Sequence, residues 1–463
     1  MKKILILAFC FTLPLVSCKK WLDQPPQGNL REDLFNTAQD AQETLNSCYD
    51  ALANLYDGRI QSISELLSDN LVQPNSNNDL RSVYARQTTF FNGTTNKVYQ
   101  DLYTVIWRCN TLLDNIDLIP DLGGSEKDRL IAEARFLRGF CHWSAVKLWA
   151  QPYGWTPGNT HAGVPIRDEA AADPLLRSTV QEVYNFAQED LEFAYSNLPI
   201  SNGVYADRMS AAGVLATFHF LKQEWGQTIN YCTEVINSEE FEFDSLTLER
   251  FPEISQAENR TSEFVFGTVS SVINGTQFID RRCGSFVNNY QINNGLAELM
   301  VSQEFQNLIN QNQADKRIAA WFEFAGGRAF AKKFFMNQNY SIPIVHLTEL
   351  HLIRAEAIAE NGGDLSIARE DLNKILNRAF EPGTNEVTSA ATAQDIIDQA
   401  RRQYRIELFG EGKYTEQLRR YGVMGENILI RNAPYDCPGM AIQFPNAEST
   451  VIGFELNPEG GCN

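Results

Sequence analysis

The sequence has few histidines and none of the compact motifs that mark the common enzyme classes. Only five histidines occur in 463 residues, and they are scattered, so we expect core or surface roles for them rather than metal ligation. The H-E-x-x-H, G-x-S-x-G, P-loop and G-x-G-x-x-G patterns are all missing. These absences argue against zinc proteases, serine hydrolases, P-loop nucleotide hydrolases and nicotinamide-dependent enzymes.

The nine cysteines form no C-x-x-C pair, so the usual zinc and redox spacings are absent as well. Cys437 and Cys462 lie in Gly- and Pro-rich C-terminal sequence, where they could close a loop in an exported protein or stay free. The sequence leaves both outcomes open. Four others lie in apolar helical stripes and are expected to be plain core residues: Cys48, Cys109, Cys141 and Cys232.

Basic residues are scarce relative to acidic ones. The chain holds 39 Lys and Arg against 58 Asp and Glu, a formal net charge of −19 at pH 7. An acidic surface repels polyanions and gains nothing from counterion release, so we exclude nucleic acid as a partner. Neutral sugars and peptides carry no such penalty.

The sequence has no apolar run long enough to span a bilayer, and its longest apolar stretch lies at the N-terminus. Two lysines precede an apolar stretch at 4–16 that is too short to span a bilayer, which is typical of a signal peptide. Residues 15–18 read Leu-Val-Ser-Cys, the pattern of a lipoprotein cleavage site. We therefore predict that residues 1–17 are removed and that Cys18 is lipidated, which anchors the protein to a membrane. Loss of the two lysines would take the net charge from −19 to −21.

Helical periodicity dominates the remainder. Apolar residues recur at helical spacing over 37–56, 97–119 and 126–150. The third run is apolar on two faces, one that carries Leu137 and another that carries Phe140. A helix with two apolar faces must lie between two neighbours, as in a solenoid of helical hairpins.

Two later stretches have the pattern of single helical hairpins. The first covers 210–238 with a turn at 225–226, and the second covers 347–380 with a turn at 362–363 and Asp364 as the next helix cap. The second spans 34 residues, which is the tetratricopeptide period. We expect a mainly α fold in which tetratricopeptide-like hairpins form a scaffold.

Long loop-rich inserts, with a few short strands such as 263–269, interrupt this scaffold. Inserts of this length in a compact protein usually carry function, so we place any binding site there. The predicted boundaries are a signal peptide at 1–17, a lipidated tether at 18–36 and one helical domain at 37–463, with scaffold at 37–240 and 347–422, ligand-loop inserts at 58–96 and 240–346, and an irregular tail at 423–463.

Several short motifs occur in an order that resembles the SusD/RagB family of outer-membrane lipoproteins. Each motif is weak alone, but their shared order from residue 18 to about 422 is hard to obtain by chance. The motifs are Cys18 followed by Leu22-Asp-x-x-Pro26, then Glu133-Ala-Arg-Phe-Leu-Arg138, Gly163-Val-Pro-Ile166, Arg177-Ser-Thr-Val-Gln-Glu-Val-Tyr184, Ser210-Ala-Ala-Gly-Val-Leu-Ala216, Leu352-Ile-Arg-Ala-Glu-Ala357 and Arg405-x-Glu407-Leu408-x-x-Glu411-Gly412.

The resemblance implies a helical protein that is not an enzyme and needs no cofactor. Its loops would bind a nutrient oligosaccharide or, as in some members, peptides. Members of the family sit as a lid on a TonB-dependent barrel of the SusC type in the outer membrane of Bacteroidota and pass the nutrient to it. A cell-surface lipoprotein with a SusC-like partner is therefore implied here.

The charged residues of these motifs look like an active-site cluster on paper, but ion pairs between helices explain them better. A lipid-anchored helical glycoside hydrolase is the alternative. Its sign would be two carboxylates that face each other across a cleft, about 5 Å or about 6.5–9.5 Å apart. The residues concerned are Arg135, Arg138, Arg354, Glu356, Arg405, Glu407 and Glu411.

Two loops have the residue types that bind sugars. Exposed aromatic rings stack on pyranose C–H groups, while Asn, Asp and Arg pair with hydroxyls. For any one residue, a solvated loop position or, for Trp321, a core position explains the pattern equally well. The first loop holds Asn75, Asn77, Asn78, Asp79, Arg81 and Tyr84, and the second group consists of Asn288, Asn289, Tyr290 and Trp321.

Overall fold

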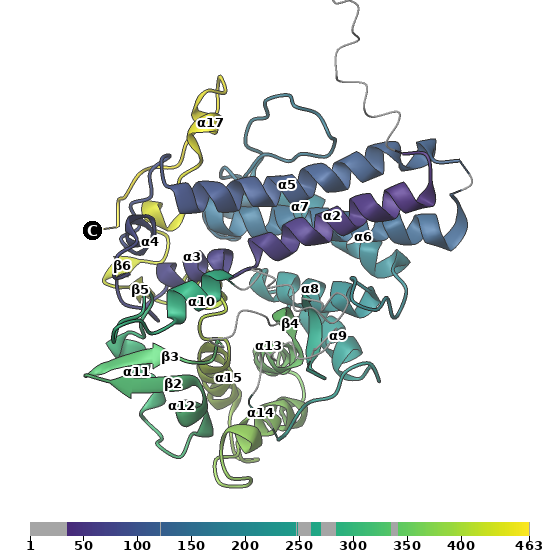
Figure 1. Ribbon diagram of the computed structural model, residues 1–463. Helices are drawn as coiled ribbons and strands as arrows, with labels where there is room; N and C mark the ends of the chain where they lie inside the picture. Colours follow the sequence, from purple (N-terminus) through teal and green to yellow (C-terminus); the bar gives the residue numbers. More distant parts are fainter. Residues whose placement is uncertain are drawn as a thin grey trace, which may run out of the picture.

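The computed structural model describes residues 35–120, 122–246, 248, 261–269, 284–334 and 341–462. Cys18, the predicted signal peptide and nearly all of the predicted tether lie outside the described residues. Helices make up most of the described chain, with short two-stranded sheets between them (Figure 1). The prediction of a mainly α fold is therefore confirmed. Within the described part, no helix combines the length and apolar character needed to cross a membrane.

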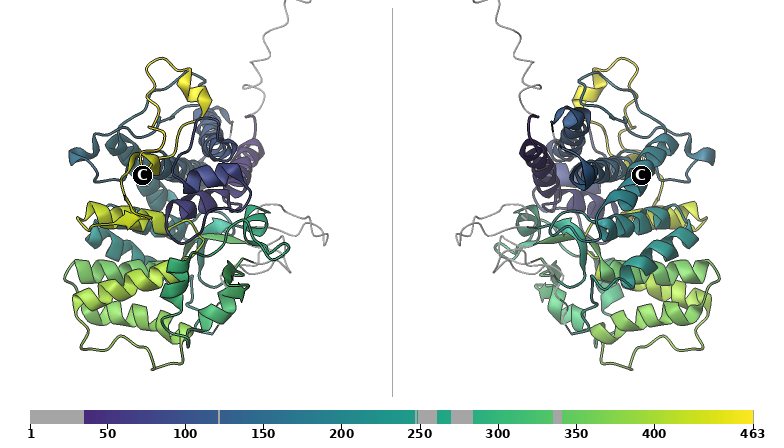
Figure 2. Two further views of the ribbon diagram at one scale, coloured as in Figure 1. Left: turned by 90° about the vertical axis from the view of Figure 1, so that its left-hand side faces the viewer. Right: turned by 90° about the vertical axis from the view of Figure 1, so that its right-hand side faces the viewer.

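Long helices stack one against the next to form the body of the molecule. Along the described chain they are α2 (Ala38–Leu55), α5 (Gly93–Asn115), α6 (Gly124–Trp149), α7 (Val180–Asn197), α8 (Arg208–Leu221), α9 (Trp225–Ile236), α13 (Leu347–Glu360), α14 (Leu365–Ala379) and α15 (Ala393–Glu407). Each helix from α2 to α9 packs on the next, α9 packs on α13, and α13 contacts both α14 and α15. Figure 2 shows the purple and blue N-terminal helices above the green α13–α15 layer. Neighbour-on-neighbour packing of this kind is that of a helical solenoid.

The two apolar faces of α6 are both used. Leu137 and Phe140 are buried on different sides of the helix, and α6 lies between α5 and α7. The predicted sandwich is confirmed. The four cysteines expected in the core are also buried and free, namely Cys48, Cys109, Cys141 and Cys232.

Both predicted hairpins are present, but the turn of the first was misplaced. Gly362 adopts a φ of +67° after α13, and the Asp364 side chain caps α14 by accepting the backbone N–H of Ser366 at 2.8 Å. In the first hairpin, Gln223 takes the left-handed conformation with a φ of +63°. Because Gln223 ends α8, helix α9 already begins at Trp225.

The inserts contain short elements that pack against the row of helices. The strand predicted at 263–269 is confirmed as β1 (Phe264–Thr268), which pairs antiparallel with β4 (Ile342–His346). The first insert holds α3 (Arg59–Leu67) and α4 (Asn78–Tyr84), and the second also holds α10 (Gly284–Tyr290), α11 (Gln303–Ile309), α12 (Lys316–Trp321), β2 (Phe322–Ala325) and β3 (Arg328–Ala331).

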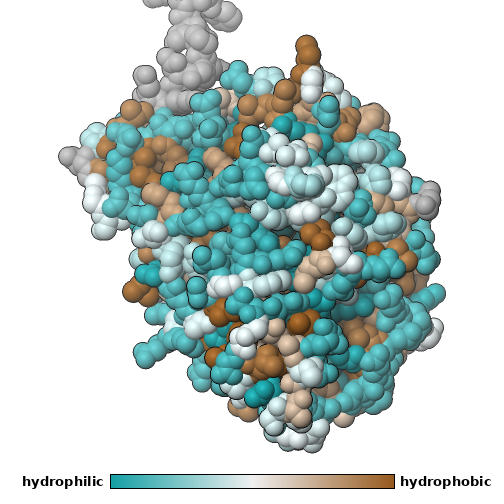
Figure 3. Space-filling model, turned by 180° about the vertical axis from the view of Figure 1, so that it is seen from behind, coloured by the Kyte–Doolittle hydropathy of each residue, from teal (hydrophilic) through white to brown (hydrophobic). Residues whose placement is uncertain are grey.

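The C-terminal part folds back along the molecule. A disulfide joins Cys437 to Cys462, and this is one of the two outcomes that the sequence left open. The elements here are α16 (Tyr414–Val423), β5 (Leu429–Ile430), β6 (Ala433–Pro434) and α17 (Asn446–Ser449). The rear face in Figure 3 is mostly hydrophilic with small separate apolar patches, because helix packing uses most of the large apolar side chains.

Buried ion pairs join successive helices. Arg138 of α6 meets Asp190 of α7 at 2.7 Å, and Arg354 of α13 meets Asp371 of α14 at 2.7 Å. The pairing predicted for the motif charges is confirmed, although two of them reach loop residues rather than a second helix. The other pairs are Arg135 with Asp190, Glu356 with Arg420, Arg405 with Asp69, Glu407 with Arg317 and Glu411 with Lys333.

Glu407 lies at the centre of a buried network of charged side chains. Its side chain is 0% exposed, and it accepts Arg317 at 2.8 Å and Arg378 at 3.4 Å. Arg378 also pairs with Glu263, beside β1, at 2.5 Å. The network therefore ties α12, α14 and α15 to the β1–β4 sheet. Removing Glu407 takes one buried partner from each of Arg317 and Arg378, which keep Asp315 and Glu263, and this loss in the interior is expensive.

We expect Glu407→Ala to destabilise the folded domain by about 3–5 kcal/mol, since Arg317 and Arg378 would lose a buried partner. Glu381→Ala is the matched control. Its carboxylate pairs with Lys316 at 3.1 Å but is 77% exposed, so its loss should cost no more than about 1 kcal/mol. Chemical denaturation of the mature chain measures both. Equal losses in the two variants would contradict the central role of Glu407.

Candidate functional site

The structure brings the two predicted ligand loops together. We call residues 71–78 and 288–301 the loop pair. The backbone N–H of Asn75 donates to the carbonyl of Glu298 at 3.2 Å, and further backbone bonds flank this contact. Beneath the pair, α3 contacts both α4 and α10 (Figure 1). The exposed residues with amide side chains in the loop pair are Gln73, Asn75, Asn77, Asn78, Asn288, Asn293 and Asn294.

Three of the predicted binding residues instead hold the first loop in shape. The Asn77 side chain caps α4 by accepting the backbone N–H of Leu80 at 3.1 Å. Asp79 accepts the backbone N–H of Thr94 at 2.9 Å, which ties α4 to the start of α5. Arg81 donates to the carbonyl of Pro74 at 2.9 Å and to that of Asn75. These groups are already occupied, so Asn75 and Asn78 are the freer candidates of the six.

Glu298 locks the two loops to each other. Its carboxylate accepts the backbone N–H groups of Ser76 and Asn77 at 2.8 and 2.7 Å, and the Ser76 hydroxyl at 2.6 Å. Burial alone would raise the pKa of Glu298, but the hydrogen bonds from Ser76 and Asn77 outweigh it and hold the pKa below the usual glutamate value. The sequence carries no signal for this role, because the partners lie more than 200 residues away.

Tyr84 is half-buried, so only part of its ring is accessible to a ligand. The Arg431 guanidinium lies 4.2 Å from the ring centroid and donates to the Tyr84 carbonyl at 2.7 Å. Arg431 and Asn432 form the turn of the β5–β6 hairpin, both with positive φ. The C-terminal hairpin thus covers one face of Tyr84 and borders the loop pair.

Two of the candidate aromatic residues occupy core positions, which is the alternative that the sequence left open for Trp321 and a correction for Tyr290. Tyr290 is 1% exposed and its ring lies 4.6 Å from that of Phe334. Trp321 is 4% exposed, and its indole N–H donates to the Leu248 carbonyl at 3.0 Å. Rings buried in this way cannot stack on a sugar. Asn289 is likewise engaged, since its amide donates to Ser62 in α3 at 3.0 Å.

An exposed aromatic residue that the sequence reading passed over lies on the next loop. Phe91 is 74% exposed and its ring lies 4.3 Å from that of Phe90. Asn92 caps α5 and donates to the Asp79 carbonyl at 2.9 Å, so the loop that carries Phe91 is attached to α4. Two adjacent phenylalanines without helical periodicity, inside a polar insert, were the signal available in the sequence.

Two acids near the loop pair share one arginine. Asp69 and Glu304 both contact Arg405, at 2.7 and 3.4 Å. Burial raises the pKa of Glu304, and a hydrogen bond with the neighbouring Asp69 carboxyl raises it further. Within the described residues, no group of three or more His, Cys, Asp and Glu side chains could hold a metal ion.

Comparison with known families agrees with this architecture. A family model described as "Starch-binding associating with outer membrane" matches residues 20–220. A second model, for the SusD family, matches residues 281–449. The chain belongs to the SusD/RagB family. The family resemblance seen in the motif order is therefore confirmed.

Curated relatives of this SusD/RagB protein are distant. Two SusD-like proteins of Formosa agariphila are 25% and 27% identical over 48% and 51% of this chain. The alignments cover 43% and 45% of those relatives, so the chain matches less than half of their length.

Solved structures extend the likeness in fold to nearly the whole chain. A SusD superfamily protein of Bacteroides thetaiotaomicron has a TM-score of 0.77 at 21% identity, and covers 91% of this chain and 100% of its own. A putative sugar-binding protein of Bacteroides vulgatus has the same score and identity, with 92% and 99% coverage. A laminarin-binding SusD-like protein has a TM-score of 0.72 at 18% identity, with 92% and 100% coverage.

We expect Glu298→Ala to loosen the first loop from the second, because Ser76 and Asn77 would lose a shared acceptor. Amide hydrogen exchange at residues 75–78 should become faster while the core helices exchange as before. Glu323→Ala, an exposed acid in β2, serves as the control and should leave residues 75–78 unchanged. Unaltered protection of the loop in the Glu298 variant would show that this carboxylate does not hold the pair together.

Proposed function

We propose that this protein is a cell-surface lipoprotein of the outer membrane that binds a neutral nutrient oligosaccharide at the loop pair and passes it to a TonB-dependent barrel of the SusC type. The observation that carries the proposal is the set of exposed amides in the loop pair together with the exposed ring of Phe91, whose loop is joined to α4 by the bond from Asn92 to Asp79. Amides both donate to and accept from sugar hydroxyls, and an aromatic face covers the C–H side of a pyranose. A net charge of −19 favours a neutral ligand over an anionic one.

The descriptions of the matching family model and of two structural neighbours favour a sugar ligand over a peptide ligand. One matching family model is described as starch-binding, and two structural neighbours carry sugar- or laminarin-binding names. Those words concern the other proteins, but they point to the same ligand chemistry as the loop pair. A peptide ligand and a glycoside hydrolase activity are therefore alternative outcomes of the binding test.

Calorimetry against laminarin oligosaccharides, malto-oligosaccharides and peptides should find a sugar ligand with a Kd between micromolar and millimolar, about −8 to −4 kcal/mol. A shallow site that must release its cargo suits this range. Phe91→Ala should weaken binding about tenfold, which corresponds to about 1.4 kcal/mol. Phe324→Ala removes a ring that is 47% exposed in the β2–β3 hairpin and should leave binding unchanged.

Each contrary result has a distinct meaning. Equal binding by wild type and the Phe91 variant would place the site elsewhere. Binding of peptides but not glycans would change the ligand class. New reducing ends, formed by the wild type and lost when one carboxylate is replaced, would establish a hydrolase instead.

The partner and the anchor can be tested together in native membranes. The wild type should co-purify with a TonB-dependent barrel, with crosslinks mainly from the helical hairpins at 126–238 and with the inserts at 58–96 and 240–346 facing the barrel mouth. A stable lid should bury more than about 1,000 Å². In cells that lack the barrel, the Cys18→Ala variant should no longer be found in the membrane fraction. Recovery of no barrel, or crosslinks from the inserts alone, would contradict the lid arrangement.

A further inference from the structure

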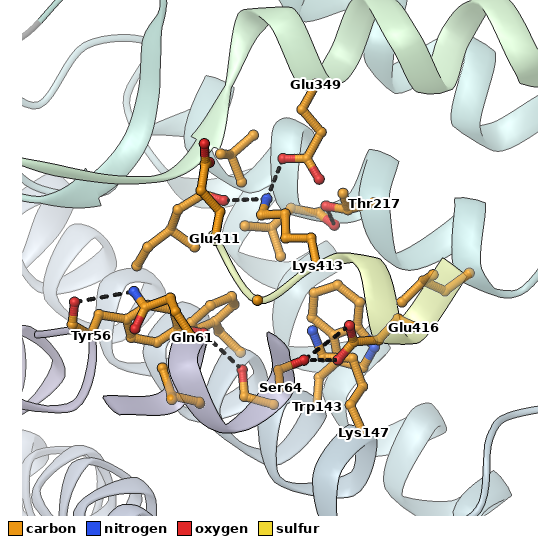
Figure 4. Close-up of a pocket in the computed structure, with 18 of the residues that line it drawn as sticks. Tyr56, Gln61, Ser64, Trp143, Lys147, Thr217, Glu349, Glu411, Lys413 and Glu416 are labelled. Atoms are coloured by element: carbon orange, nitrogen blue, oxygen red, sulfur yellow. Dashed lines mark hydrogen bonds and ion pairs between the residues drawn. The ribbon is translucent and has the colours of Figure 1, made fainter. Parts of the chain in front are cut away.

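A cavity of about 80 Å³ with both polar and apolar lining lies where α3, α6, α8 and α16 meet (Figure 4), and Lys147 and Glu416 on its wall are half-buried. A smaller cavity of about 30 Å³ adjoins it, and Lys147, Leu221 and Glu416 line both. Together the two spaces can hold several non-hydrogen atoms. No residue of the loop pair lines either space, so an inference from them is independent of the proposed function.

Most of the charged groups around these cavities already have partners. Lys413 pairs with Glu349, as Figure 4 shows. Glu411 pairs with Lys333 at 2.7 Å, and Arg420 pairs with Glu356 at 2.7 Å. Each of these three pairs joins one basic and one acidic group, so each is neutral by itself.

Three charged groups remain, and two of them are basic. Lys147 lies with its ammonium 4.0 Å from the centroid of the Trp143 ring. Arg419 donates to the carbonyls of Lys147 and Ala150 at 2.8 and 2.7 Å and to the side-chain oxygen of Gln151 at 3.2 Å, but its Nε finds no acceptor among the described residues. Glu416 accepts the Ser64 hydroxyl at 3.4 and 3.5 Å. In the described part of the chain, neither Lys147 nor Arg419 has a carboxylate at ion-pair distance.

The local electrostatics reflect this imbalance. Burial lowers the pKa of Lys147 and lowers that of Arg419 to about 10, and in both cases Glu416 is the strongest opposing charge. Burial raises the pKa of Glu416. Asp436 also acts on Arg419, but it is half-buried near the surface, where it accepts the indole N–H of Trp155 at 3.0 Å. One half-buried carboxylate, that of Glu416, thus acts on two basic groups.

We propose that the joined cavities form a binding site for one small monoanion, a halide or a short carboxylate such as acetate, held between Lys147 and Arg419. Arg419 is 3% exposed, so its free Nε–H cannot turn to bulk water. An anion would supply the missing acceptor for that N–H and a counter-charge for the Lys147 ammonium. Because Lys147 belongs to α6 and Arg419 to α16, the bound anion would also join two helices far apart in the sequence.

Bromide is a suitable probe because it is small and scatters anomalously. Crystals of the wild type grown in sodium bromide should show an anomalous peak beside Lys147. The melting temperature should rise with bromide and level off when bromide replaces gluconate, an anion too large for the cavity, at constant ionic strength. Lys147→Met should abolish both the peak and the rise. Lys127→Met, on the same helix but paired with the exposed Asp117, should retain both.

Glu416→Gln distinguishes an anion site from a simple water-bridged ion pair. Removing the competing carboxylate should lower the bromide concentration for half-maximal effect severalfold, whereas an internal Lys147–Glu416 pair would only lose stability. Water alone in the cavity, a bromide response that survives Lys147→Met, or weaker bromide binding in the Glu416 variant would overturn the proposal. If Lys147→Met does not fold, the wild-type anomalous map and the Glu416 variant still decide. Oligosaccharide binding is measured separately and does not depend on the result.

Discussion

The architecture depends on charges that are buried and paired between neighbouring helices. Apolar contact alone lets two helices slide or rotate, because it is not directional. A buried guanidinium opposite a carboxylate is satisfied in one register only, and any other register leaves an unpaired ion in the interior. Arg138 with Asp190 fixes α6 on α7, and Arg354 with Asp371 fixes α13 on α14. Around Glu407 the same principle joins helices from separate parts of the row to the small β1–β4 sheet.

This rigid frame lets the inserts be irregular. The loop pair gains its shape from local caps and from one long-range lock, Glu298, rather than from a core of its own. Loops held in this way keep their exposed amides in place at a modest entropic cost. The division of labour between frame and loops explains why a shared fold can serve different ligands, since loop residues can change without disturbing the helix pairs.

The interior is more polar than a helical scaffold requires. Lys147, Glu416 and Arg419 face cavities rather than well-packed apolar neighbours, and full ion pairing is reserved for the helix junctions around them. A site of this kind lies where the N-terminal and C-terminal parts of the chain meet. An anion bound there would therefore affect how the N-terminal and C-terminal parts of the chain are held together, without any contact with the ligand loops.

Local information in the sequence determined the helices and their roles. The two apolar faces of α6 and the glycine turn before Asp364 depend on spacing within a few residues, and the structure agrees with both. The predicted position of the turn in the first hairpin was wrong, because nothing in the sequence marks Gln223 as a residue in the left-handed conformation. Only the tertiary structure decided that Tyr290 and Trp321 are core rings, that the two loops meet, and that Glu298 locks them. Those facts depend on contacts between residues far apart in the chain, and a single sequence carries no period or motif that records them.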